Sequence, residues 1–162
     1  MKQLFFIILT VLSFKAIGQK AYQLQGNEVA INKGIVFKVG TADLEKSSDE
    51  ALHTIKIYLS DKPYVSLLRI ESHTDNVIPN AQPLSEKRAL AICKRLVELG
   101  VDCKRLIAVG FGANKPIADN STSTGKTQNN RISLVNVALR DRNIGRLPAD
   151  GGGVVAGDVC KN

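Results

Sequence analysis

The apolar pattern of residues 34–139 changes repeatedly between the period of two that is typical of strands and the period of about 3.6 that is typical of helices. Short runs rich in β-branched and aromatic residues predict four strands, at 34–39, 64–72, 105–112 and 131–139. This alternation restricts the chain to folds in which helices pack on a sheet.

The segment between the first two predicted strands has the start and stop signals of a helix. Ser47 and Glu50 have the spacing of a capping box, apolar residues then recur at helical spacing, and Pro63 forbids continuation. We therefore expect a helix over 48–60. A further short helix is expected in the polar segment 123–129.

A second long helix is predicted over 84–99. Pro83 suits the first turn of a helix, and Gly100 supplies the left-handed conformation in which helices commonly end. Its apolar stripe consists of Ala89, Cys93, Leu96 and Leu99.

The predicted elements follow one another in the order βαβαββ. The economical packing for this order is an α/β fold of the α+β two-layer sandwich type, with two main helices on one face of a mixed four-stranded sheet. We expect the domain to span 34–139, preceded by a short lead-in at 19–33 and followed by a glycine-rich tail at 140–162.

Residues 1–18 have the composition of a secretory signal. Lys2 precedes an apolar run over 4–14, and small residues at 16–18 predict cleavage before Gln19. An uncleaved membrane anchor is the alternative, although the run is shorter than the roughly 20 apolar residues of a membrane span. Cleavage predicts an exported protein in the periplasm or associated with the outer membrane, whereas an uncleaved anchor would link the inner membrane to the wall.

The formal charge of +7 is spread along the chain rather than clustered. Such a distribution is typical of a solvated surface, and it also suits an anionic polymer or a membrane surface as partner. Export and the absence of Trp disfavour nucleic acid as a partner.

Three cysteines, Cys93, Cys103 and Cys160, are compatible with one disulfide and one unpaired thiol in an oxidising compartment. Cys93 is either a small core residue or the partner of Cys103. The cysteine spacing does not match a zinc site, and the two histidines do not complete one, so neither a metal nor another cofactor is expected.

Asp75 and Arg88 stand out as candidate binding residues. Asp75 follows a predicted strand, and Arg88 lies in the first turns of the next helix, so the connecting loop brings them toward one another. Taken singly, Asp75 caps its own turn and Arg88 lies on a solvated face. Taken together they suit a zwitterion, whose ammonium would meet the carboxylate and whose carboxylate would meet the guanidinium. Catalysis would need a second carboxylate, a nucleophile or a metal set beside His73, and the sequence shows none.

Four ordered motifs resemble the OmpA-like peptidoglycan-binding domain of outer-membrane proteins, peptidoglycan-associated lipoproteins and flagellar stator proteins. They are SHTD at 72–75, LSEKRA at 84–89, GFGANKPIADN at 110–120 and NNRI at 129–132. In addition, IVFKVGTADL at 35–44 looks like the first strand and turn of that family.

The resemblance implies non-catalytic, non-covalent binding of the cell wall through the meso-diaminopimelate of the peptidoglycan stem peptide. Asp75 would meet the amino group and Arg88 the carboxylate, and Thr74 and Asn76 would offer further hydrogen-bonding groups. Other proteins of the envelope or outer membrane are expected as possible partners.

The chain departs from the family pattern in the loop from Asp75 to Arg88, which is shorter than usual, and at three further positions. Ser72 replaces a glycine, Asn80 is the nearest substitute for an asparagine that the family places one position later, and Asn130 replaces the first arginine of the last motif. Arg131 is therefore the single arginine left in that motif. These departures sustain the alternative of an exported protein-interaction module that has the same fold but does not bind the wall.

Overall fold

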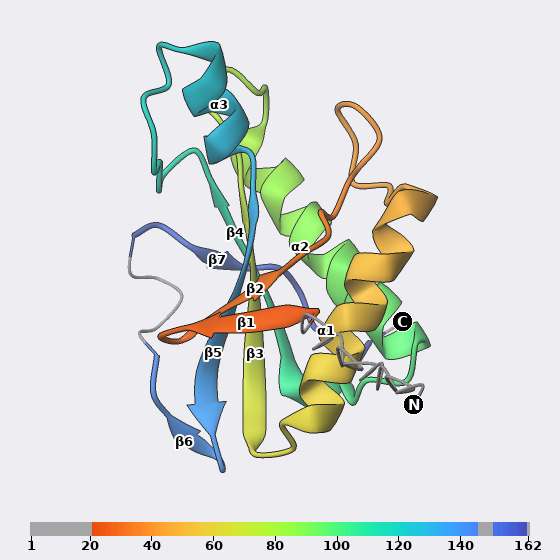
Figure 1. Ribbon diagram of the computed structural model, residues 1–162. Coiled ribbons are helices and arrows are strands. Elements are labelled where there is room, and N and C mark those ends of the chain that lie inside the picture. The colour runs from red at the N-terminus through yellow and green to blue at the C-terminus, as the bar shows by residue number, and fades with distance from the viewer. Residues whose placement is uncertain (1–20, 146–150, 162) are drawn as a thin grey trace, which may run out of the picture.

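The computed structural model describes residues 21–145 and 151–161, in which strands and helices form one sheet with helices on its face (Figure 1). The strands are β1 (Tyr22–Gln25), β2 (Glu28–Ile31), β3 (Val65–His73), β4 (Leu106–Gly112), β5 (Ile132–Leu139), β6 (Arg142–Asn143) and β7 (Val154–Val155). The helices are α1 (Asp49–Asp61), α2 (Ala81–Glu98) and α3 (Ser123–Asn129), with short 3₁₀ turns at Lys46–Ser48 and Cys103–Arg105. None of the described helices is both long and apolar enough to cross a membrane.

The strand order in the sheet is β1-β2-β5-β3-β4-β7, and β6 pairs with β5. Strands β3 and β4 run parallel, whereas every other described pair is antiparallel. The connection from β3 to β4 contains α2, as a parallel pair requires. The predicted mixed sheet and the α+β class are therefore confirmed.

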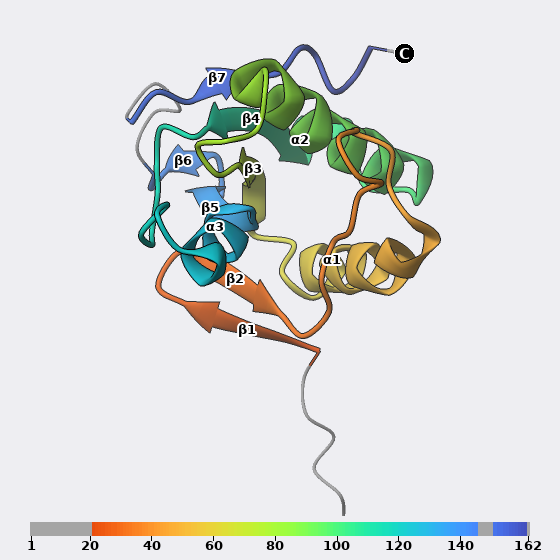
Figure 2. The ribbon, with the colours of Figure 1, turned by 90° about the horizontal axis from the view of Figure 1, so that it is seen from above.

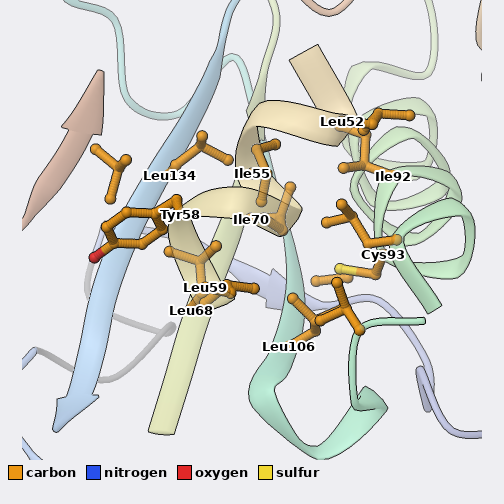
Figure 3. Packing of buried hydrophobic residues seen from close by; sticks show 14 of the residues in the cluster. Leu52, Ile55, Tyr58, Leu59, Leu68, Ile70, Ile92, Cys93, Leu106 and Leu134 are labelled. Atoms are coloured by element: carbon orange, nitrogen blue, oxygen red, sulfur yellow. The ribbon is translucent and has the colours of Figure 1, made fainter. Parts of the chain in front are cut away.

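Helices α1 and α2 cover one face of the sheet, as the view from above shows (Figure 2). Their apolar sides meet alternate residues of β3 and β4 in the core (Figure 3). The largest fully buried side chains include Leu52, Ile55, Tyr58, Leu59, Leu68, Ile70, Ile92, Leu96 and Phe111. A buried hydrogen bond between α1 and β5 joins the Tyr58 hydroxyl to the Asn136 side-chain carbonyl at 2.8 Å.

The predicted first strand at 34–39 is wrong. That segment forms only an isolated bridge between Phe37 and Leu44, because its backbone bonds locally: Lys38 N–H donates to the Asp43 carbonyl and Glu45 N–H to the Val36 carbonyl. Strand β2 lies beside β5 instead.

Strands β1 and β2 form a hairpin within the segment expected to be a lead-in. Gly26 closes its two-residue turn with φ of +62°, a conformation that favours glycine.

Both predicted long helices are present, with shifted starts. The expected capping box is not formed: the residue before α1 is Ser48, and its hydroxyl bonds the backbone of Val36 rather than the helix. Helix α2 begins at Ala81, three residues earlier than predicted, and Pro83 lies in its first turn. The short helix expected at 123–129 is confirmed as α3.

The tail is attached to the domain rather than free of it. Strand β7 pairs with β4, and Ala156 and Val159 join the buried core. A disulfide joins Cys103 to Cys160, so the alternative Cys93–Cys103 pairing is wrong, and Cys93 is a buried free thiol on α2. The predicted signal at 1–18 lies outside the described residues.

Candidate functional site

The candidate residues gather at the end of the sheet where β3 and β4 finish and β5 begins, beside α3 at the top of Figure 1. A pocket of about 350 Å³ opens there. It is lined by Ile35, Val36, Phe37, Val39, Gly40, Ser72, His73, Ile78, Arg88, Asn130, Arg131 and Ile132. Aliphatic and aromatic side chains thus form its walls, with two guanidinium groups and one amide among them.

Asp75 is buried and is held by Asn130. The Asn130 side-chain amide donates to Asp75 Oδ2 at 2.7 Å, and its carbonyl accepts from the Asp75 backbone N–H at 3.0 Å. The other carboxylate oxygen accepts from the Val77 N–H at 2.9 Å, which closes an Asx-turn. Asn130 lines the pocket and Asp75 does not, so Asp75 is connected to the pocket through its hydrogen bonds with Asn130.

Arg88 enters the pocket from the second turn of α2 and is half-buried. Its Nε donates to the Thr41 carbonyl at 2.9 Å, and its guanidinium carbon lies 5.0 Å from the centre of the Phe37 ring. Burial lowers the pKa of Arg88, but a guanidinium starts from so high a value that it stays charged. No carboxylate of the described residues forms an ion pair with it.

Arg131 lies across the pocket from this helix, at the start of β5. Its terminal nitrogens donate to the backbone carbonyls of Lys115 and Asn129, at 3.2 and 3.5 Å. Burial lowers the pKa of Arg131, although nearby Glu71 opposes this. The structure therefore presents two cationic groups toward one cavity.

Of the predicted site residues, only Arg88 and Arg131 line this pocket, and Asp75, Thr74, Asn76 and Asn80 do not. Thr74 is buried, and its backbone N–H donates to the Gly112 carbonyl, while its hydroxyl has no hydrogen-bond partner among the described residues. Asn76 and Asn80 are exposed. Asn80 has φ of +53° and its carbonyl accepts the Leu84 N–H at the start of α2, which gives it a role in the turn.

A buried charge network lies on the face of β3 that is turned away from α1 and α2. Arg69 Nε donates to Glu71 Oε1 at 2.7 Å, and Glu71 Oε2 lies 3.2 Å from His73 Nε2 and 3.5 Å from Lys115 Nζ. Burial alone would raise the pKa of Glu71, but His73, Arg69 and Lys115 lower it to about 2. The carboxylate is thus ionised and fully neutralised by its neighbours.

His73 completes this network. Burial lowers the pKa of His73 against the opposing effect of Glu71, so the ring is neutral near pH 7. It stacks on Phe111 with the ring centres 5.0 Å apart. The sequence suggested a structural role for this histidine but gave no sign of its partners.

Asn130 is the site residue that sequence reasoning missed. The replacement of an arginine at this position suggested only a loss of positive charge. A side-chain amide carries both a hydrogen-bond donor and an acceptor. Asn130 can therefore bond the backbone N–H and the carboxylate of Asp75 at the same time. The contact spans 55 positions in the sequence, so no local pattern could indicate it.

The arrangement can bind a small ligand that carries both charges. A ligand carboxylate can bond the guanidinium groups, an ammonium can approach the Asp75 side, and an alkyl chain can lie along the apolar walls. Among the described residues, no group of three His, Cys, Asp or Glu side chains could hold a metal ion.

Comparisons with known proteins agree with this architecture. Outer membrane porin F of Pseudomonas aeruginosa is 34% identical over 107 residues, which are 64% of this chain and 30% of the porin. A MotB-like protein from Desulfovibrio vulgaris superposes with a TM-score of 0.62 at 20% identity, covering 70% of this chain and 75% of that one. The peptidoglycan-associated lipoprotein from Burkholderia pseudomallei gives 0.56 at 27% identity, covering 64% and 88%.

The chain spans less than half the length of three curated relatives that it matches, with 30%, 21% and 44% of their lengths covered. Within this chain, the profile of the OmpA family matches residues 36–131. That range is more than half of the 162 residues and contains the three helices and all the residues that line the candidate pocket except Ile35 and Ile132. The chain therefore belongs to the OmpA family.

Proposed function

We propose that this protein binds peptidoglycan non-covalently, without catalysis, through the meso-diaminopimelate of the stem peptide. The observation that carries the proposal is the pocket at the end of β3. There the guanidinium of Arg88 has no carboxylate partner among the described residues, and the buried carboxylate of Asp75 is connected to the pocket through its hydrogen bond with Asn130.

The chemistry of meso-diaminopimelate fits that pocket. Its free end carries an ammonium and a carboxylate on one carbon, and a short alkyl chain connects that carbon to the peptide. Each charge-assisted contact contributes roughly 1.5 to 3 kcal/mol. Two such contacts correspond to millimolar or somewhat tighter affinity for the isolated amino acid, and the many sites of a wall add avidity.

The cell envelope is the compartment that supports this function. The relatives reported above include an outer membrane porin and a peptidoglycan-associated lipoprotein. The Cys103–Cys160 disulfide is of the kind that persists in oxidising compartments such as the periplasm. We therefore place the protein in the periplasm, or in association with the outer membrane, after export by the predicted signal.

Co-sedimentation with isolated sacculi tests the proposal. Purified residues 19–162 should sediment with the sacculi, and excess free meso-diaminopimelate should release them. Asp75→Ala and Arg88→Ala should each abolish sedimentation. Matched controls are Arg142→Ala, on exposed β6 at the other end of the sheet, and Glu98→Ala, at the far end of α2.

Circular dichroism of each variant establishes that the domain remains folded. Sedimentation that survives both site substitutions, or that free meso-diaminopimelate leaves unchanged, would refute the proposed ligand. A protein partner would then become the better explanation for the fold.

A further inference from the structure

A second cavity, larger than the Arg88 pocket, lies between β2 and β5. These strands pair at a single register position, Glu28 with Val135, and no register pair joins residues 29–31 to 132–134. The opening that results has a volume of about 460 Å³. It is lined by Gln25, Glu28, Val29, Ala30, Ile31, Asn32, Lys33, Gly34, Ile35, Asn130, Arg131, Ile132, Ser133 and Leu134. We call it the β2–β5 groove.

Backbone groups of both strands face this groove. Asn32 N–H bonds to the segment before β1, so by the alternation of a strand Ile31 directs its own N–H and carbonyl to the opposite edge, toward β5. His73 N–H bonds the Arg131 carbonyl, so Ile132 directs its backbone groups away from β3 and toward β2. The groove thus offers two strand edges at which an extended peptide could form main-chain hydrogen bonds.

The β2–β5 groove and the Arg88 pocket share part of their walls. Ile35, Asn130, Arg131 and Ile132 line both cavities. Arg131 therefore stands at the junction, and the partners of its terminal nitrogens are backbone carbonyls rather than carboxylates. A chain that leaves the pocket along this shared wall would enter the groove and would pass the half-buried guanidinium of Arg131.

We propose that the β2–β5 groove binds the peptide that continues from the residue held in the Arg88 pocket. The bound peptide lies extended between the edges of β2 and β5, with a peptide carboxylate on Arg131. This inference rests on the proposed function and deepens it: the ligand is a carboxylate-bearing stem peptide rather than a single amino acid.

Two ligands distinguish binding in the Arg88 pocket from binding in the β2–β5 groove. Free meso-diaminopimelate fills only the pocket, whereas the tripeptide L-Ala-γ-D-Glu-meso-diaminopimelate, with its free D-Glu carboxylate, extends into the groove. Isothermal titration or NMR titration should give an affinity for the tripeptide at least about tenfold higher, the equivalent of one or two added hydrogen bonds to a charged group.

Gly34 provides a matched pair of variants. It lines the groove and not the pocket, its φ is not positive, and an added Cβ would meet no atom within 4 Å. Gly34→Trp should therefore fill the groove without disturbing the fold. It should remove the tenfold gain for the tripeptide and leave the affinity for free meso-diaminopimelate unchanged, whereas Gly34→Ala should behave like wild type.

Hydrogen exchange gives an independent measurement. The backbone amides of Ile31 and Ile132 should become protected when the tripeptide binds and should not when free meso-diaminopimelate binds. Equal affinity of wild type for both ligands, or a tripeptide gain that survives Gly34→Trp, would overturn the groove proposal alone. Failure of wild type to bind either ligand would overturn the proposed function as well.

Discussion

Replacing Asn130 with aspartate tests whether this residue holds the site in place. The change is isosteric, and one oxygen still accepts the Asp75 backbone N–H. The other oxygen replaces the amide nitrogen that lies 2.7 Å from Asp75 Oδ2. Two negative charges at that separation repel by about 1.5 kcal/mol in bulk water and about 6 kcal/mol at an effective dielectric constant of 20. Asp75 is only 6% exposed but Asn130 is exposed to solvent, so we expect a cost nearer the lower of these values.

A shared proton relieves that repulsion in the folded variant, so its stability should depend on pH. The folded variant retains a proton that the unfolded chain has already lost above about pH 4. The folded state then binds more protons than the unfolded state, and the free energy of unfolding falls as pH rises. Asn130→Ala removes the same hydrogen bonds without adding a charge, and should be less stable than wild type by about 2 kcal/mol at every pH.

Urea unfolding followed by circular dichroism, at intervals between pH 4.5 and 8, measures both effects. The difference between Asn130→Asp and wild type should grow with pH, and the difference between Asn130→Ala and wild type should not. A gap between Asn130→Asp and wild type that stays constant from pH 4.5 to 8 would refute the proposed contact.

Three further measurements test the fold that carries the site. Cys160→Ser should lower the free energy of unfolding by up to about 4 kcal/mol, the loop-closure value for a sequence separation of 57, and a urea midpoint equal to that of oxidised wild type would contradict it. Gly110→Ala should destabilise strongly, because the new Cβ would lie 2.5 Å from the backbone nitrogen of Glu86, whereas Gly34→Ala should be neutral in the same thermal melt. The pKa of Glu71 is lowered to about 2, so stability that is present above about pH 4.5 should be lost as the pH falls toward 2; a Glu71→Gln variant should lose less over that range.

The sequence predicts the central elements well because their signals are local. Pro63 and Gly100 mark helix ends, and the branched residues of β3 and β5 match buried strands. The prediction of a strand at 34–39 is wrong because β-propensity does not tell whether the sheet has a strand edge with which the segment can pair. In the structure β2 pairs with β5 instead. Gly26-Asn27 between two alternating segments was an available hairpin signal for β1 and β2.

The site is less predictable than the fold because its contacts are long-range. Arg88 could be placed near the end of β3 from helix position alone, but its partner Thr41 lies 47 residues away. From the sequence, Asn130 is interpreted only as the loss of an arginine. Its role depends on two hydrogen bonds to Asp75, which the sequence does not indicate. Contacts of this kind depend on how loops from different elements meet, which periodicity does not encode.

The burial of Cys93 also bears on how the protein reaches its native state. In an unfolded chain Cys103 meets Cys93, ten residues away, more readily than Cys160, and the difference in loop-closure free energy is about 1.5 kcal/mol. The native pairing reverses this preference because α2 carries Cys93 into the core, where it is fully buried. Oxidation that precedes docking of α2 would therefore trap a ten-residue loop that the native helix cannot accommodate. Formation of the native Cys103–Cys160 bond is therefore most direct when α2 packs before the thiols are oxidised, and otherwise needs exchange of a Cys93–Cys103 bond.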